Sequence, residues 1–316
     1  MTTTETRTAP RRHRVRPSWP RRAAPLVVAA LPWTWFLIRD ATPSLNIVAF
    51  VLPGVAGVAT LVALAVAALV ARIRAAIVAG SLLVFTIAIV VGPRLPRSSP
   101  EPIQPFRLVA ANAYDLNLEP LAAARALVAQ DPDVLVAVET KPAVLTALRR
   151  GLPTHSLSRF AGLNVMARWP VRHLGPIRSV PPATAMRVEV LRPGGPFVLY
   201  ALHLANPLHD VSFSQSAGTV SRVLRAAEAE RLPVVVAGDF NMTDRTTSYR
   251  LLDAALRDAM RSSYAGSTYE RGLWTLLQLR IDHVFTTPRW CGANPSTFAV
   301  PGSDHRGLSV ELGPCG

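Results

Sequence analysis

Acidic, amide and imidazole side chains recur at the ends of apolar runs after residue 105 of this 316-residue chain. The stretch PVVVAGDFNMTD, residues 233–244, runs from apolar residues into Gly238, Asp239 and Asn241. Carboxylate and amide oxygens suit hard divalent cations, and Asp and His are common proton-transfer groups. The residues of this kind are Asn112, Glu139, His203, Asp239, Asn241, Asp282, Asp304 and His305. Together they could bind a divalent cation and activate a water molecule.

Each of these residues alone has an ordinary structural explanation. Asn112 could satisfy a turn, and Asp239 could form a local side-chain turn with its own backbone. A lone His203 is more often a hydrogen-bonded core residue than a functional one. A site is therefore predicted only if the fold brings the whole set together.

The elements that would position these residues are short apolar strands alternating with helices. Runs such as FVLYALH and VVVAGD are rich in Val and Leu and indicate strands covered on both faces. Helical patterns occupy 118–130, 140–152, 212–232 and 246–260, the last with Thr246 or Thr247 as its N-cap. This alternation predicts two sheets packed face to face with helices outside, and strand ends meeting on one rim.

Residues 23–92 are almost free of charge and favour a membrane location. The predicted transmembrane helices are 23–38, 46–71 and 75–92. The second would rise about 39 Å, more than the ~30 Å of a hydrocarbon core. The first could instead be a signal peptide, but it lacks a clear small-residue cleavage site, which favours a retained helix.

Arginine placement predicts the orientation of these helices. The basic tail, 1–22, carries seven arginines and is expected to stay in the cytoplasm, as is the turn with Arg72 and Arg74. Three crossings then place the Pro-rich linker, 93–105, and the soluble domain, 106–316, outside the cytoplasm. Arg94 and Arg97 would lie on the outer side, against this rule.

Charge and cysteine content set further limits. The net charge is +14, but from residue 102 onward 22 basic residues face 17 acidic ones, so the excess is mainly N-terminal and does not indicate a nucleic-acid groove. The predicted spans hold no interior charge, which argues against a transporter. Cys291 and Cys315 could form a disulfide outside the cytoplasm or remain as two thiols.

Several motifs occur in a familiar order between residues 105 and 313. They are LVAANAYDLN, DPDVLVAVET, GLNVMARWPV, YALHLANP, GDFNMTD, RIDHVFTT and GSDHRGLSVEL. In this order they resemble the endonuclease/exonuclease/phosphatase superfamily of metal-dependent, deoxyribonuclease I-like phosphoesterases. The resemblance implies an α+β fold, a four-layer α/β/β/α sandwich.

The resemblance also implies roles for the candidate residues. Glu139 would bind the metal, with Asn112 and Asp304 completing its shell, and Mg²⁺ is the expected ion, with Mn²⁺ or Ca²⁺ as alternatives. The implied catalytic residues are His203, Asp239, Asn241, Asp282 and His305. Asp239 would orient and deprotonate the attacking water, Asn241 would donate to transition-state oxygens, and Asp282 would hold His305. His203 and His305 would contact the phosphate.

The expected function is that of a membrane-anchored, metal-dependent hydrolase that cleaves phosphate esters by water attack outside the cytoplasm. The substrate would be nucleic acid or a phospholipid head group. The lipid bilayer is the other expected partner, and no protein partner is predicted. The alternative is a non-catalytic binding or scaffold protein on the same fold.

Overall fold

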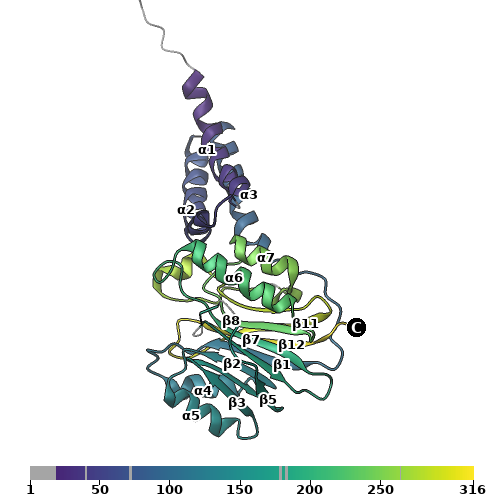
Figure 1. Ribbon diagram of the computed structural model, residues 1–316. Coiled ribbons are helices and arrows are strands. Elements are labelled where there is room, and N and C mark those ends of the chain that lie inside the picture. Colours follow the sequence, from purple (N-terminus) through teal and green to yellow (C-terminus); the bar gives the residue numbers. More distant parts are fainter. Residues whose placement is uncertain (1–18, 40, 71–72, 178–179, 182–183, 264) are drawn as a thin grey trace, which may run out of the picture.

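A helical stalk stands on one side of a two-sheet domain in the computed structural model (Figure 1). The structure describes residues 19–316 apart from 40, 71–72, 178–179, 182–183 and 264. Most of the predicted basic tail, 1–22, therefore lies outside the described residues.

Three helices form the stalk. They are α1 (Trp19–Ile38), α2 (Asn46–Val70) and α3 (Ile73–Val90), with the short 3-10 helices η1 (Pro43–Leu45) and η2 (Gly92–Arg94) at their ends. Among the described residues, one stretch, Ala75–Arg94, is long and apolar enough to cross a membrane. Pro43–Val51 and Gly54–Ala65 pass the same test only as a pair bent by 50°, and the apolar stretch Ala29–Ile38 is shorter. The prediction of three transmembrane helices is thus not supported; length and composition allow one span, or two.

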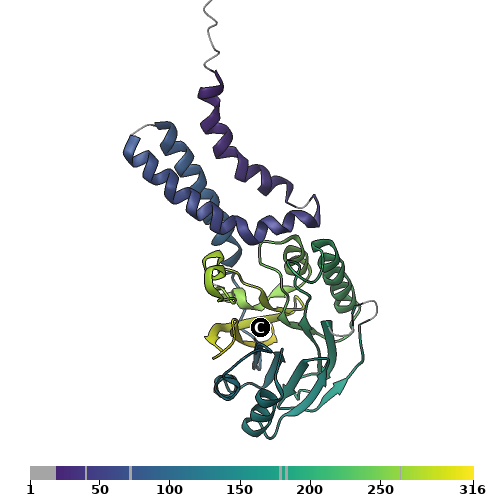
Figure 2. The same cartoon turned by 90° about the vertical axis from the view of Figure 1, so that its left-hand side faces the viewer.

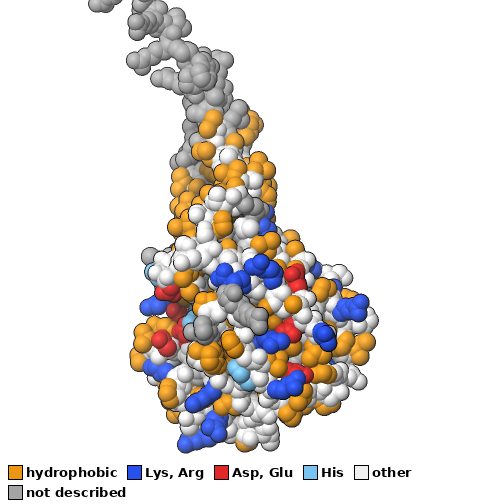
Figure 3. Space-filling model, viewed as in Figure 1, with side chains coloured by type: hydrophobic (Ala, Val, Ile, Leu, Met, Phe, Trp, Pro, Cys, Tyr) orange, Lys and Arg blue, Asp and Glu red, His pale blue; other side chains and the backbone are white. Residues whose placement is uncertain are grey.

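The stalk exposes much of its apolar surface. Hydrophobic side chains cover the helices where they approach the domain (Figure 3). Exposed residues include Val55, Val58 and Leu61 on α2 and Val84 and Ile87 on α3. Burying such surface in water-excluding surroundings is favourable, so these faces require a cover of protein or lipid.

The domain is built from two six-stranded mixed sheets. The first has the order β11-β12-β1-β2-β4-β3 and the second the order β5-β6-β7-β8-β10-β9. The first sheet comprises β1 (Phe106–Asn112), β2 (Val134–Val138), β3 (Ser156–Phe160), β4 (Leu163–Ala167), β11 (Trp290–Ala299) and β12 (Arg306–Pro314). The second comprises β5 (Val171–His173), β6 (Ala185–Val190), β7 (Phe197–His203), β8 (Val234–Asp239), β9 (Arg257–Asp258) and β10 (Asp282–Thr286).

Helices cover both outer faces of the sheet pair. They are α4 (Pro120–Val128) and α5 (Pro142–Gly151) on the first sheet and α6 (Phe213–Glu228) and α7 (Thr247–Ala255) on the second. One apolar core lies between the sheets, and one lies under each helix pair. The α/β/β/α layering is therefore confirmed, with α6 and α7 nearest the stalk and α4 and α5 farthest from it (Figures 1 and 2). Thr246 caps α7 through its side chain, as one of the two predicted candidates.

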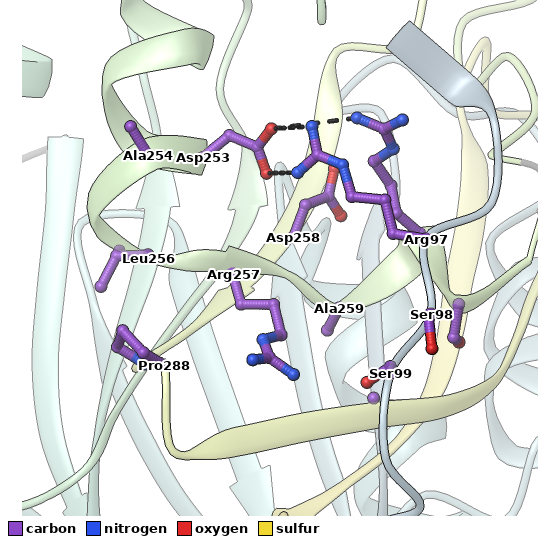
Figure 4. A pocket seen from close by; sticks show the side chains of 13 residues that line it. Arg97, Ser98, Ser99, Asp253, Ala254, Leu256, Arg257, Asp258, Ala259 and Pro288 are labelled. Atoms are coloured by element: carbon purple, nitrogen blue, oxygen red, sulfur yellow. Dashed lines mark hydrogen bonds and ion pairs between the residues drawn. The ribbon is translucent and has the colours of Figure 1, made fainter. Parts of the chain in front are cut away.

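The Pro-rich linker lies along the domain instead of standing free. The backbone N–H of Arg97 donates to Arg261, and that of Ile103 donates to Pro314. The guanidinium of Arg97 also pairs with Asp253 of α7 at 2.7 Å (Figure 4). These contacts join the end of α3 to the domain.

Arg94, at the end of the stalk, is 1% exposed and belongs to a buried ion network. Its Nε lies 3.1 Å from Asp244 Oδ2, which is also 3.3 Å from Nε of Arg280. Arg280 continues to Asp258 at 2.6 Å. Although burial alone raises the pKa of Asp244, Arg94, Arg245 and Arg280 outweigh it and hold this pKa well below its usual range. Arg94 is thus neutralised inside the protein, whereas Arg97 forms an ion pair at its surface.

Cys291 and Cys315 form a disulfide, with their Cα atoms 5.0 Å apart. The sequence left open a disulfide or two thiols, and the structure has the disulfide. The bond ties the last residues of the described chain to the start of β11, beside the pairing of Cys291 with Gly313 in the β11–β12 ladder.

Candidate active site

Strand register brings the polar strand ends to one edge of the sandwich. In the first sheet β1 and β2 run parallel, and Asn112 pairs with Val138, the residue before Glu139. In the second sheet β7 and β8 run parallel with His203 paired to Asp239, and Asp282 of β10 lies opposite Asp239. Parallel neighbours end at the same edge, so the prediction that these ends meet is confirmed in the geometry.

The backbone around Asp239 adopts conformations that its sequence allows. Gly238 has φ of +136°, and a Cβ there would lie 2.1 Å from the carbonyl oxygen of Leu202. Asn241 has φ of +46°, a left-handed conformation that Asn tolerates better than most residues. The GDFN sequence therefore closes a tight turn that presents Asp239 and Asn241 together.

Asp239 is the centre of the site and is 1% exposed. Its Oδ2 accepts a 3.1 Å hydrogen bond from the amide Nδ2 of Asn112 and one of 3.3 Å from Nδ2 of Asn241. Its Oδ1 accepts from the backbone N–H of Asn241 at 2.8 Å. Nδ2 of Asn241 also donates to Leu204, so both amide protons of Asn241 already have acceptors. In this state Asn241 orients Asp239.

Glu139 faces His203 across the two sheets. Oε1 of Glu139 lies 3.0 Å from Nε2 of His203, and Oε2 accepts from the backbone N–H of Asp115 at 3.4 Å. Burial alone would raise the pKa of Glu139, but hydrogen bonds from His203 and Asn112 lower it to about 2. Although burial lowers the pKa of His203, Glu139 and Asp239 raise it overall. Glu139 is therefore ionised at neutral pH.

His305 is held by two carboxylates. Its Nδ1 lies 2.9 Å from Asp282 Oδ2, and its Nε2 lies 3.8 Å from Asp239 Oδ2. Burial of the ring lowers its pKa, but Asp282 and Asp239 together outweigh this effect and raise it to about 10. The Nδ1–H of the ring thus donates to Asp282, and its Nε2 lies near the carboxylates of Asp239 and Asp304.

The pKa of Asp239 is raised, whereas that of Glu139 is lowered. Burial, with Asp282 nearby, outweighs the attraction of His305 and His203 and raises the pKa of Asp239 to about 6. A carboxylate with a pKa near neutral is suited to accept a proton from water. Two neighbouring carboxylates with separated pKa values are typical of acid–base sites.

Asp304 sits at the margin of this cluster. Its Oδ1 is 4.0 Å from Nε2 of His305, and its Oδ2 pairs with Arg271 at 3.4 Å. All eight predicted residues therefore lie in or beside one cluster, and a role for Asp304 as a metal ligand stays a prediction.

Two groups of side chains among the described residues could hold a metal ion. One is Glu139, His203 and Asp239, and the other is Asp239, Asp282 and His305, each with ligand atoms within 4.8 Å of one another. The first group combines an ionised carboxylate with a second carboxylate, the ligand type that a hard divalent cation prefers. Asn112 lies beside them, but its Nδ2 faces Asp239 and its Oδ1 accepts from the backbone N–H of Tyr114, so its predicted role as a metal ligand stays a prediction. Glu139 and His203 of the first group are partly exposed, whereas the second group is buried throughout, so the first is more accessible to a metal ion.

Several supporting residues were not found by sequence reasoning. The buried Thr268 accepts from the backbone N–H of Asp282, and Ser303 links Asn112 to the backbone of His305. Arg271 lies 5.8 Å from the ring of Tyr114 and contacts Asp304. Ser303 stands within the quoted GSDHRG motif, whereas Thr268 and Arg271 come from a segment without a recognisable pattern.

The fold and the site define a class of two-sheet phosphoesterases, and comparisons agree with it. The model of the endonuclease/exonuclease/phosphatase family matches residues 109–305. No curated protein matches the chain in sequence.

Solved structures share the fold at low sequence identity. D. rerio TDP2 complexed with a single-strand DNA product is 18% identical with a TM-score of 0.55, over 66% of this chain and 99% of that one. The human Nocturnin catalytic domain with bound sulfate is 14% identical with a TM-score of 0.52, over 69% and 100% of the two chains. An endonuclease/exonuclease/phosphatase from Beutenbergia cavernae is 22% identical with a TM-score of 0.50, over 68% and 72%.

The chain belongs to the endonuclease/exonuclease/phosphatase family. It is accordingly a metal-dependent hydrolase acting on phosphate ester bonds.

Proposed function

We propose that this protein is a membrane-anchored phosphodiesterase or phosphatase that hydrolyses phosphate esters by water attack outside the cytoplasm. The observation that carries the proposal is Asp239, a buried carboxylate shared by Asn112, Asn241, His203 and His305. Such a carboxylate, beside an ionised Glu139, can receive a proton from water at a phosphate-binding centre.

Glu139 and Asp239 would hold the metal, Asn112 would orient Asp239 through Nδ2, and Mg²⁺ is the ion that oxygen ligands favour. A bound divalent cation supplies charge neutralisation and polarises the phosphoryl oxygen. Asp239 accepts the proton of the attacking water. The imidazolium of His305 and the ring of His203 stabilise negative charge on the phosphoryl oxygens. Asp282 positions His305 through Nδ1.

Membrane anchoring is supported by the exposed apolar faces of α2 and α3 and by the apolar stretch Ala75–Arg94. The outward orientation is supported by the disulfide between Cys291 and Cys315, since disulfides persist in oxidising compartments. The N-terminal arginines point to the same orientation.

The test is hydrolysis of bis-p-nitrophenyl phosphate by the full chain in detergent or nanodiscs. We expect turnover with Mg²⁺ or Mn²⁺ that stops with EDTA, and a loss of about 10³-fold or more in Glu139→Gln and Asp239→Asn. Absence of turnover with any divalent cation in a folded sample would favour the scaffold alternative.

Orientation is tested separately with reporters at the C-terminus. A reporter active only outside the cytoplasm should be active there, and activity of a cytoplasm-only reporter would contradict the proposed side.

A further inference from the structure

The start of α2 is part of the rim of the active site. Phe50 is 3% exposed and packs with Leu279 and Ile281, and Ile281 directly precedes Asp282 along the chain. Its ring lies 5.7 Å from that of Phe213 at the start of α6. The first turns of α2 therefore rest on the domain beside α6 (Figure 2).

Two further contacts fix this docking. Oδ1 of Asn46 accepts from the backbone N–H of Thr247 at 3.1 Å, at the start of α7. Gly54 meets the 3-10 helix η5 (Gly272–Leu277), where an added Cβ would lie 2.4 Å from Leu277. The absence of a side chain at residue 54 thus lets α2 and η5 lie close together.

A cavity of about 390 Å³ is lined by Phe50 of this helix and by Asn241 of the active site. Its lining includes Phe50, Asn206, His209, Asn241, Tyr269 and Arg271. One wall thus comes from the stalk and another from Asn241, which orients Asp239. The volume falls within the range of about 300–1,000 Å³ typical of small-molecule sites.

The lining is amphipathic. Phe50, Leu279 and Ile281 supply an apolar wall, while Asn206 and Arg271 supply polar groups. Arg271 adds a cation that contacts Asp304, next to His305. A ligand that fits this lining carries a negative charge toward the metal site and an apolar part toward α2.

The apolar wall continues onto surface that is exposed toward the stalk. Along α2 beyond Phe50, Val51, Val55 and Val58 are exposed. Leu276 on η5, which packs against α2, is 72% exposed. A phosphodiester in a bilayer leaflet presents the same order of groups, with the phosphate at the surface and acyl chains beside the helices.

We propose that this cavity is the substrate subsite and that its occupant is a membrane phospholipid, whose phosphodiester reaches the catalytic residues while its acyl chains stay in the bilayer beside α2. The inference rests on the proposed function. One water adds to phosphorus, one P–O ester bond breaks, and the proton of the water ends on the leaving oxygen. The products are an alcohol and a phosphomonoester, so no further reactant is required.

A nucleic acid would favour the opposite side of the site. There a second cavity of about 560 Å³ is lined by Arg149 and Arg159 together with Thr140, the residue after Glu139. That cavity lies on α5 and β3, away from the stalk, and it offers two cations to a phosphate backbone.

The experiment uses the full chain in nanodiscs of phosphatidylglycerol and phosphatidylethanolamine, with lipid products read by mass spectrometry. Bis-p-nitrophenyl phosphate and a DNA oligonucleotide serve as soluble substrates. The variants are Phe50→Ala, which removes the apolar wall, and His209→Trp, which fills the cavity from an exposed position and should not disturb folding. Arg149→Ala with Arg159→Ala is the matched control in the other cavity.

We expect lipid hydrolysis, and a fall of roughly tenfold or more in the ratio of lipid to soluble-substrate kcat/KM in both cavity variants. The control should leave that ratio unchanged. Turnover of bis-p-nitrophenyl phosphate without lipid hydrolysis, or an unchanged ratio in His209→Trp, would overturn the inference while the proposed function stands. Preferred cleavage of DNA that is lost in the variant with Arg149→Ala and Arg159→Ala would also overturn the inference while the proposed function stands. No turnover of any phosphodiester would overturn both.

Discussion

Asn112 donates a 3.1 Å hydrogen bond to Asp239, and the two residues end strands that belong to different sheets. The bond joins β1 of the first sheet to β8 of the second at the edge where the metal-binding groups meet. The active site is therefore a product of how the two sheets pack. The turn at Gly238, the imidazole of His305 and the buried ion network of Arg94 can each be tested by substitution.

Asp282 is a positioning residue, because it acts through His305. Replacing it in Asp282→Asn removes the carboxylate 2.9 Å from Nδ1 that helps to raise the pKa of His305. We expect kcat/KM to fall about 10²-fold or more and the alkaline limb of its pH profile to move to lower pH. Asp253→Asn, on α7, is the control. A fall in rate with an unmoved alkaline limb would indicate a purely structural role.

His283 is a core residue that should make stability depend on pH. Its Nε2 bonds to the carbonyl of Met242, and burial together with Arg280 lowers its pKa to about 4. An unfolded His has a pKa of about 6.5, so the stabilisation is complete above pH 6.5 and is lost as the pH falls toward 4, by about 1.4 kcal/mol per pH unit.

Asp239, with its pKa raised to about 6, acts in the opposite direction over nearly the same window. The informative quantity is therefore the difference in unfolding free energy between His283→Gln and the unmodified chain. We expect it to shift by about 3 kcal/mol in favour of the variant between pH 7.5 and pH 4. A pH-independent difference between His283→Gln and the unmodified chain would contradict the prediction.

The two arginines after α3 should differ in their effect on stability. Arg94 is buried against Asp244, so Arg94→Ala should cost about 3 kcal/mol or more, because it leaves a buried carboxylate with fewer partners. Arg97 pairs with Asp253 while half exposed, so Arg97→Ala should cost about 0–1 kcal/mol. Thermal unfolding of the full chain in detergent measures both. Equal costs would show that the Arg94 network does not join the stalk to the domain.

Position 238 requires a glycine because the backbone of Leu202 lies close to it and because its own backbone φ is positive. In Gly238→Ala the new Cβ would meet the carbonyl oxygen of Leu202 at a backbone φ of +136°. We expect a loss of about 2–3 kcal/mol in stability, with lower activity because Asp239 is the next residue. Gly266→Ala, where an added Cβ meets nothing within 4 Å, is the control. Wild-type stability in Gly238→Ala would contradict the close packing of β7 on β8.

The sequence by itself determined the layered fold and the eight candidate residues. Strand ends can be read from apolar runs that stop at a polar residue, as at Asn112 and Asp239, and parallel pairing then places those ends on one edge. Thr246 could likewise be read as a helix cap, because capping depends on residues close in sequence.

Tertiary structure decided which distant elements meet. The pairing of Cys291 with Cys315, the burial of Arg94 against Asp244 and the docking of Phe50 on the active-site rim all join segments far apart in the chain. Three transmembrane helices were expected, but among the described residues the helices that are long and apolar enough to cross a membrane number one, or two if the bent pair is one span. Local periodicity records which face of an element is buried, but the partner that buries it is set by long-range packing, which a sequence pattern does not encode.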